Sequence, residues 1–525
     1  MKNLRNIMFI SLTTTLLLSC SEDLLETVPN DRVSSEIFWQ TDNDAIAAAN
    51  AVYTYLPSAE AVFNWDGMSD IAHITLMWRS ESIIEKGSFD ASIDKVNNEW
   101  DNSYKGIQTA NTFLANVDKV QTNDQELIDR LKGEVKVLRA YFYIKLAMLY
   151  GDVPLITTPL TIEESKNLTR MPVAQVWDFI NQEFTEAAAV LPTSQQEKGR
   201  ITKGAALALK ARAMLYAGRY PEAAAAAKQV MDLNVYSLYP SYEKLFSYEA
   251  ENNQEVILDN QYIEDIRGNS AFGYLAPFSQ QARGEVVPTK KAVDAFQMKN
   301  GKDISDLGSG FDPMNPYANR DPRLHYSVFV IGDKLPNGET YNSLPGSGTA
   351  DAIGYSENST PTGFNIKKYV NKEDLGEPWD CGINIILMRY AEVLLIYAEA
   401  KIEANQIDLS VLDAINQVRQ RPDVNMPPIT STSQAELRNI IRDERLRELA
   451  FEGLRYFDIR RWKIAESILP GIVYGMTYYS NQENQFKTIS LPTFVKAFNT
   501  NRDYLWPIPQ KERELSPQLA QNPNW

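Results

Sequence analysis

Residues 435–463, AELRNIIRDERLRELAFEGLRYFDIRRWK, form the stretch that decides the fold. Its apolar residues recur at three- and four-residue steps, which is the spacing of one face of an α-helix. Acidic and basic residues stand three or four positions apart between them, so opposite charges could meet along an exposed face. We therefore predict one long amphipathic helix that packs against a large helical body.

Gly453 lies in the middle of this pattern, where a glycine costs about 1 kcal/mol of helix propensity relative to alanine. Its presence predicts that another backbone segment passes close by. Glu444, Glu448 and Glu452 follow one another at four-residue steps. Carboxylates on one helix project the same way and do not flank a glycosidic bond, so this spacing favours a structural ion-pair network over catalysis.

The composition is typical of a soluble globular protein with a large core, since 44% of the 525 residues are hydrophobic and 23% are charged. A net charge of −16 argues against a nucleic-acid partner, because the phosphate backbone is itself negative. The two histidines, His73 and His325, stand in no metal-ligand spacing, so no metal or other cofactor is predicted. Cys381 precedes an apolar run and is expected to be a buried thiol.

The first residues are typical of a secretion signal. Lys2 and Arg5 precede an apolar run that is too short to span a bilayer, and the segment ends in Leu-Leu-Ser-Cys at 17–20. That ending resembles a bacterial lipobox, which implies cleavage before Cys20 and lipidation of this residue. We expect residues 1–19 to be a signal peptide, residues 20–40 a lipidated tether, and the mature protein to be anchored in the outer membrane.

Helical periodicity dominates residues 41–235 and returns over residues 384–525, with poorly periodic loops at 57–98. Predicted helices cover residues 41–56, 99–117, 124–150, 173–191, 202–217, 220–233, 384–404 and 409–419. The small-residue join at 215–223 is typical of a tetratricopeptide-like helix pair. Residues 236–383 are instead rich in Gly, Pro, Asn and Tyr, with strand-like runs at 255–262, 326–331 and 364–370. The predicted fold is mainly α: a paired-helix scaffold that carries a loop-rich, ligand-facing middle region and minor β-structure.

Six separated segments resemble signatures of the SusD/RagB family, the surface glycan-binding lipoproteins of Bacteroidota, and they follow the family's order. They are the lipobox at Cys20 and residues 138–154, 218–223, 389–400, 435–463 and 507–523. The resemblance implies a SusD-like fold without catalytic activity that binds an oligosaccharide or polysaccharide or, less often, a peptide. It also implies a SusC-like TonB-dependent transporter as partner, and the acidic residues after Cys20 resemble a signal for export to the cell surface.

A sugar ring packs its apolar C–H face on an aromatic side chain, and its hydroxyls need polar partners at the rim. Aromatic residues in polar, non-periodic stretches are therefore the candidate ligand contacts. The candidates are Trp65, Asp66, Trp78, Arg79 and Phe89 in residues 57–98, and Phe272, Tyr274, Phe278, Arg283, Phe311, Tyr317, Tyr355 and Trp379 in the middle region. The alternative for each aromatic residue is that its ring is buried against its own loop and contacts no ligand. Trp39, Trp100 and Trp462 are assigned to the core.

Three classes of function stay open at this point. The leading interpretation is glycan binding without turnover, with peptide binding as its variant. A second is an endo-acting glycoside hydrolase that uses loop carboxylates such as Asp66 and Asp90. A third is a structural scaffold of the outer membrane that holds no ligand. His325 is expected to be a hydrogen-bonded structural residue under any of them.

Overall fold

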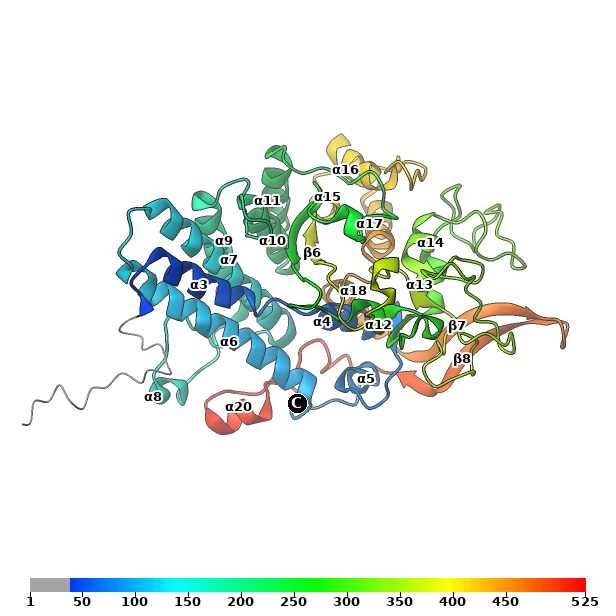
Figure 1. Ribbon diagram of the computed structural model, residues 1–525, viewed down its shortest axis with the longest axis horizontal. Helices are drawn as coiled ribbons and strands as arrows, with labels where there is room; N and C mark the ends of the chain where they lie inside the picture. The colour runs from blue at the N-terminus through cyan, green and yellow to red at the C-terminus, as the bar shows by residue number, and fades with distance from the viewer. Residues whose placement is uncertain (1–37) are drawn as a thin grey trace, which may run out of the picture.

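The computed structural model describes residues 38–525, so the predicted signal peptide, the lipidation site at Cys20 and most of the predicted tether lie outside the described residues. The described chain is mainly helical, as predicted (Figure 1). Its α-helices are α3 (Asp42–Tyr53), α4 (Ala59–Gly67), α5 (Ser80–Glu85), α6 (Asp94–Asn116), α7 (Gln125–Tyr150), α8 (Ile162–Ser165), α9 (Val173–Val190), α10 (Lys203–Tyr216), α11 (Tyr220–Asp232), α12 (Ala271–Leu275), α13 (Lys290–Ala295), α14 (Arg323–Ser327), α15 (Tyr390–Glu403), α16 (Leu409–Arg419), α17 (Gln434–Leu449), α18 (Arg455–Arg461), α19 (Ala465–Ile468) and α20 (Gln510–Leu515). Its strands are β1 (Ala72–Ile74), β2 (Val256–Asn260), β3 (Val286–Pro288), β4 (Val328–Phe329), β5 (Asn365–Ile366), β6 (Ile385–Arg389), β7 (Gly471–Ser480) and β8 (Gln485–Lys496).

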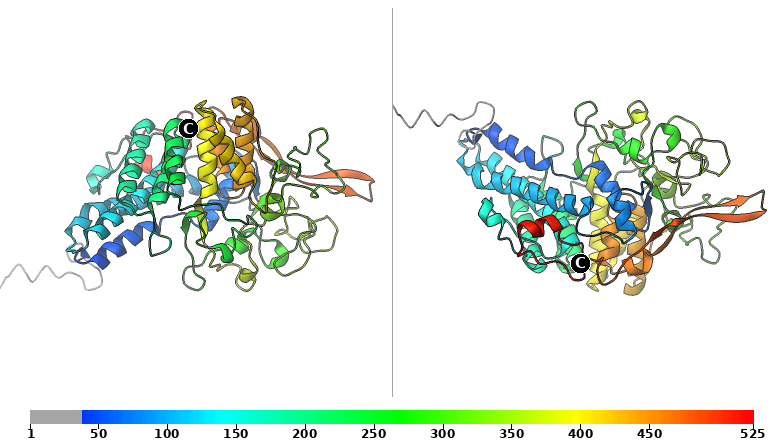
Figure 2. Two further views of the ribbon diagram at one scale, coloured as in Figure 1. Left: turned by 90° about the horizontal axis from the view of Figure 1, so that it is seen from above. Right: turned by 90° about the horizontal axis from the view of Figure 1, so that it is seen from below.

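Helices that follow one another in sequence pack side by side and form a continuous layer. α6 packs on α7, α7 on α9, α9 on α10 and α10 on α11. The join between α10 and α11 contains Gly218, whose φ of 72° is a left-handed conformation that suits glycine. After the loop-rich region the chain returns to the same layer, because α15 packs against α11 and then against α16 and α17 (Figure 2). The predicted paired-helix scaffold is therefore present.

Residues 435–463 form two helices, so the prediction of one long helix is wrong. α17 and α18 are separated by a turn in which Phe451 and Gly453 have φ values of 64° and 80°. A Cβ atom on Gly453 would lie 2.7 Å from the carbonyl oxygen of Val62, so the predicted close approach of another backbone is confirmed. Buried apolar residues continue on both sides of the turn, which is why the spacing alone resembled a single helix.

Two acidic residues of α17, Glu444 and Glu448, are buried, whereas Glu436 and Asp443 are exposed, so the expected exposed charged face is only partly present. The Glu448 carboxylate accepts hydrogen bonds from Arg323, Arg389 and Arg421 at 3.0, 2.7 and 2.9 Å, and Glu444 accepts one from Arg323 at 2.7 Å. A buried carboxylate is tolerated only where it is paired and hydrogen-bonded. The predicted ion-pair network is thus confirmed, but its partners come from α14, β6 and the segment after α16.

Two parts of the predicted C-terminal helical region are strands. The predicted helix at 384–404 begins as β6, which pairs antiparallel with β2, and becomes helical only at Tyr390. Residues 471–496 form the antiparallel pair β7–β8, called the hairpin arm below, which extends from the body of the protein (Figures 1 and 2). Along much of β8, more and less exposed residues alternate with a period of two, which distinguishes strands from helices.

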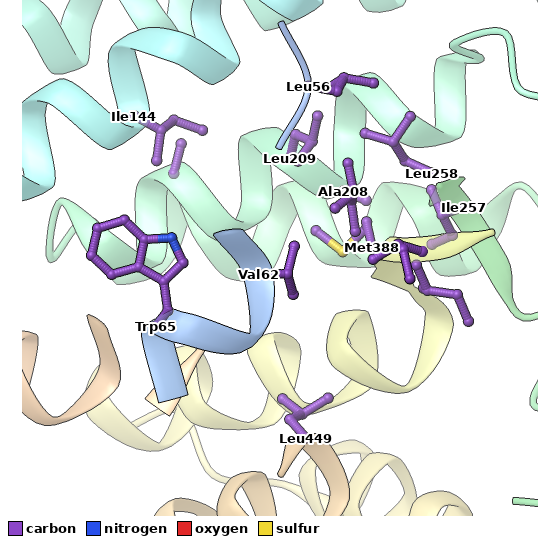
Figure 3. Close-up of a cluster of buried hydrophobic side chains, with 14 of the residues drawn as sticks. Leu56, Val62, Trp65, Ile144, Ala208, Leu209, Ile257, Leu258, Met388 and Leu449 are labelled. Atoms are coloured by element: carbon purple, nitrogen blue, oxygen red, sulfur yellow. The ribbon is translucent and has the colours of Figure 1, made fainter. Parts of the chain in front are cut away.

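Residues 57–98 contain α4, β1 and α5 rather than only loops. α4 is an interior helix: Figure 3 shows its side chains Val62 and Trp65 between Ile144 of α7 and Leu449 of α17. The three strand-like runs of the middle region do form strands, β2, β4 and β5, each shorter than predicted.

Candidate functional site

The pairing of β1 with β3 brings together two loops that carry predicted ligand contacts. The loop after β1 holds Trp78 and Arg79, and the loop before β3 holds Arg283 and Glu285. The Thr75 amide donates a hydrogen bond to the carbonyl oxygen of Glu285 at 2.9 Å, which extends the contact between the strands into these loops.

A third loop is held against the same place by Gly273 of α12. The Gly273 amide donates to the carbonyl oxygen of Pro378 at 2.6 Å, and its own carbonyl oxygen accepts from the Arg283 amide at 2.9 Å. A Cβ atom on Gly273 would lie 2.5 Å from Cδ2 of Trp379. Because glycine has no Cβ atom, the Trp379 indole can pack directly against this backbone.

Arginine side chains connect the two exposed tryptophans. The Arg79 guanidinium lies 5.7 Å from the centre of the Trp78 ring and donates to the Glu285 carboxylate at 2.5 Å. The Arg283 guanidinium lies 5.0 Å from the centre of the Trp379 ring and 3.8 Å from the same carboxylate. We call the set formed by Trp78, Arg79, Tyr274, Arg283, Glu285 and Trp379 the aromatic platform.

The platform has an exposed rim and a buried floor. Trp78 is 76% exposed and Trp379 41% exposed, whereas Glu285 and Tyr274 are buried. Burial raises the pKa of the Glu285 carboxyl although Arg79 and Arg283 oppose this rise. The platform therefore offers indole surface and guanidinium N–H donors to a ligand, which are the groups that hold a sugar ring and its hydroxyls.

Five predicted ligand contacts are buried in this structure. They are Trp65, Asp66, Phe89, Phe272 and Tyr274. Segments that are remote in sequence cover them, and the clearest case is the C-terminal tail.

The ring centroids of Trp65 and Phe89 lie 5.6 and 6.3 Å from that of Trp506, and Phe89 also contacts Trp525. Tyr274 still belongs to the platform, because its ring lies 5.3 Å from the Arg79 guanidinium.

The structure thus brings four candidates together: Trp78, Arg283 and Trp379, which are exposed, and Arg79, which is half-buried. The other candidates lie apart from the platform or are partly buried. Tyr355 is exposed on the loop before β5, Tyr317 lies beside the hairpin arm, and Phe278 and Phe311 are half-buried.

Sequence reasoning missed one neighbour of the platform, Met77, and one of its members, Glu285. Met77 is exposed beside Trp78, and Glu285 pairs with both arginines. The acidic residue two positions after Arg283 was the available signal for this ion pair.

The residues assigned to structural roles lie largely as predicted. Trp39 and Trp100 are buried, and Cys381 is buried with its pKa raised to about 12 by desolvation. His325 is hydrogen-bonded through both ring nitrogens, to Asp333 at 2.8 Å and to a backbone carbonyl at 3.0 Å.

The assignment of Trp462 to the core is wrong, because this residue is only half-buried. Its Nε1–H donates to Glu399 at 2.7 Å, and the guanidinium of Arg461 lies 4.8 Å from the centre of its ring. The residue therefore lies at the edge of an ion-pair cluster rather than in the apolar core.

Asp66 is not available for acid–base chemistry on a bound glycan. Its two carboxylate oxygens accept hydrogen bonds from the amides of Gly453 and Arg455 at 2.9 and 3.0 Å, and burial raises its pKa to about 7. Asp90 lies at the surface and accepts from the amide and hydroxyl of Ser92. Residues 38–525 contain no group of three or more His, Cys, Asp or Glu that could hold a metal ion. None of the helices described there is long and apolar enough to cross a bilayer.

Comparison with known proteins identifies the family. A family model described as the SusD family matches residues 243–525, and a model described as starch-binding and associating with the outer membrane matches residues 26–215. The first model covers more than half of the chain, so the protein belongs to the SusD family. The resemblance inferred from the six segments is confirmed.

Individual relatives are similar along nearly the whole chain. SusD-like proteins P25 and P2 of Formosa agariphila are 25% and 27% identical to it, over 97% and 99% of this chain and 96% and 97% of theirs. A solved SusD-like carbohydrate-binding protein of Bacteroides fragilis is 30% identical with a TM-score of 0.85, over 92% of this chain and all of that one. A second SusD-like structure from the same species is 27% identical with a TM-score of 0.83, over 95% of this chain and all of that one.

Proposed function

We propose that this protein captures an oligosaccharide or polysaccharide at the cell surface on the aromatic platform. The observation that carries the proposal is the pair of exposed tryptophans, Trp78 and Trp379, placed beside two arginines that one buried carboxylate orients. Stacking on an aromatic ring contributes about 0.5–1.5 kcal/mol beyond the area that it buries. Two such rings beside guanidinium donors suit a glycan segment better than a single sugar.

The relatives support this ligand class. The Bacteroides fragilis structure is described as a carbohydrate-binding protein, and another structure of the same fold is described as a laminarin-binding SusD-like protein. We further propose that the chain is lipid-anchored in the outer membrane through Cys20 and hands its ligand, uncleaved, to a SusC-like TonB-dependent transporter. The lipobox-like ending at 17–20 and the family description of association with the outer membrane support this part.

Isothermal titration against starch, laminarin, xylan, mannan and pectin fragments tests the ligand class. We expect saturable heat with at least one glycan and no new reducing ends after prolonged incubation. Heat from peptides alone would favour the peptide-binding variant, and new reducing ends would identify a hydrolase. Purification of the tagged protein from its native membrane tests the partner, since the transporter is expected to remain bound.

A further inference from the structure

A groove lies between the loop-rich region and the hairpin arm, and it shares no lining residue with the aromatic platform. Residues 313–318 and 331–333 form one side, and residues 476–479 of β7 form the other. Its volume of about 580 Å³ is within the range of pockets that hold small ligands. The arm that forms one wall extends beyond the body of the protein beside the middle-region loops (Figures 1 and 2).

Three tyrosine residues line the walls of this groove. Tyr317, Tyr478 and Tyr479 line it, and only the last donates a hydrogen bond from its hydroxyl, to Asn484 on the arm. Within the described residues the hydroxyls of Tyr317 and Tyr478 have no hydrogen-bond partner. Asn481 also lines the groove and carries a side-chain amide. Rings that offer an apolar face and a free hydroxyl, next to an amide, provide both kinds of contact that a sugar makes.

The charges of the groove compensate each other. Asp333 is the carboxylate among the described lining residues, and it is hydrogen-bonded to Nδ1 of His325 at 2.8 Å. Nε2 of His325 is held by the carbonyl oxygen of Tyr317 at 3.0 Å. No lysine or arginine is among the lining residues of the described chain, so a sulfated or uronate sugar would find no counter-charge there. This composition favours a neutral ligand.

We propose that the groove is a second carbohydrate site, which binds a neutral oligosaccharide with Tyr317 and Tyr478 as its stacking rings. The inference rests on the proposed glycan-binding function but concerns a separate surface. The site lies between residues 313–318 of the loop-rich region and β7 of the hairpin arm.

Methionines inside the groove provide a local reporter for the test. Met314 and Met476 line it, and ¹³C-methyl labelling of methionine gives each an NMR signal that Met314→Leu and Met476→Leu assign. Maltohexaose, laminarihexaose, xylohexaose and mannohexaose are titrated into the wild type and into a Trp78→Ala/Trp379→Ala double variant that lacks the platform rings. We expect at least one of these sugars to shift both methyl signals saturably in both proteins.

Two tyrosine variants on β7 distinguish the loss of a groove contact from a general disturbance of the hairpin arm. Tyr478→Ala removes a groove ring and is expected to weaken the binding seen at the methionines about tenfold or more, the equivalent of one aromatic contact. Tyr474→Ala removes an exposed ring of the same arm that does not line the groove, and it is expected to leave that binding unchanged.

The outcomes distinguish this proposal from the function of the platform. If a sugar gives heat with the wild type but moves neither methionine signal, the groove proposal is wrong and the platform proposal stands. If the signals shift but the double variant loses no heat, the groove stands and the platform fails. Shifts caused only by oligogalacturonate or by a peptide digest, or no shift with any of the four sugars, also overturn the inference.

Discussion

Replacement of Glu448 by glutamine tests whether the buried ion-pair network stabilises the fold. The substitution keeps the volume of the side chain but removes the charge that faces Arg323, Arg389 and Arg421. Breaking a buried pair by removing one partner costs about 3–5 kcal/mol. Each arginine keeps a second carboxylate, such as Glu255 for Arg389 at 2.8 Å, so we expect a loss near the lower end, about 3 kcal/mol.

Urea unfolding at pH 7 measures this loss, with an exposed pair as control. Lys228 and Asp232 form an ion pair on the surface of α11, and Lys228→Gln is expected to cost less than about 0.5 kcal/mol. If the free energy of unfolding of Glu448→Gln is within about 1 kcal/mol of the wild-type value, the network contributes little to stability and the reasoning is refuted.

The pH dependence gives a second measurement of the same network. Burial alone would raise the pKa of the Glu448 carboxyl, but Arg389, Arg421 and Arg323 hold it well below its ordinary value of 4.5. A carboxyl with a depressed pKa contributes stability that is present above its unfolded-state pKa and is lost as the pH falls toward its folded-state pKa. The stability difference between wild type and Glu448→Gln should therefore be constant near neutral pH and shrink below about pH 4.5. A difference that grows on acidification would contradict this sign.

Two further predictions concern backbone and hydroxyl contacts. Gly453→Ala places a Cβ atom 2.7 Å from the carbonyl oxygen of Val62 in a left-handed conformation, so it should destabilise by about 2–4 kcal/mol in urea unfolding. Gly310→Ala has a similar φ and open space around it, so a loss of more than about 2 kcal/mol there would show that the close approach is not the cause. Tyr216→Phe removes a buried hydroxyl without a partner in the described chain and should change the free energy of unfolding by less than about 0.5 kcal/mol. Tyr150→Phe breaks a 2.6 Å hydrogen bond and should cost about 1 kcal/mol in the same assay; equal losses for the two tyrosines would contradict the assignment.

The helical scaffold could be predicted because its signals are local. The helix periodicity of residues 173–190 and the glycine at 218 each depend on a few neighbouring residues, and both features are present in the structure. Residues 435–463 show the limit of this approach. Their apolar spacing continues through a turn that is fixed by Asp66, a residue almost 400 positions away in sequence.

The candidate site was only half predictable for the same reason. Trp65 and Trp78 both lie in a polar, Ser- and Asp-containing stretch, yet one is 4% exposed and the other 76% exposed. The difference depends on Trp506 of the tail, which packs against Trp65. Likewise, Trp78 and Trp379 belong to one surface because β1 pairs with β3 and because the Trp379 ring packs against the backbone of Gly273. Neither contact can be read from the composition of the loops.

Titration of single-ring variants tests the central claim most directly. Trp78→Ala, Trp379→Ala and the double variant are compared by calorimetry with Tyr355→Ala, which removes a similarly exposed ring outside the platform. At about 1–1.5 kcal/mol for each ring, each tryptophan variant should bind the glycan about five- to tenfold more weakly. The double variant should lose most of the measurable binding to the platform, and the tyrosine variant should match the wild type. Unchanged affinity in the double variant, with its fold intact by circular dichroism, would contradict glycan capture on the aromatic platform.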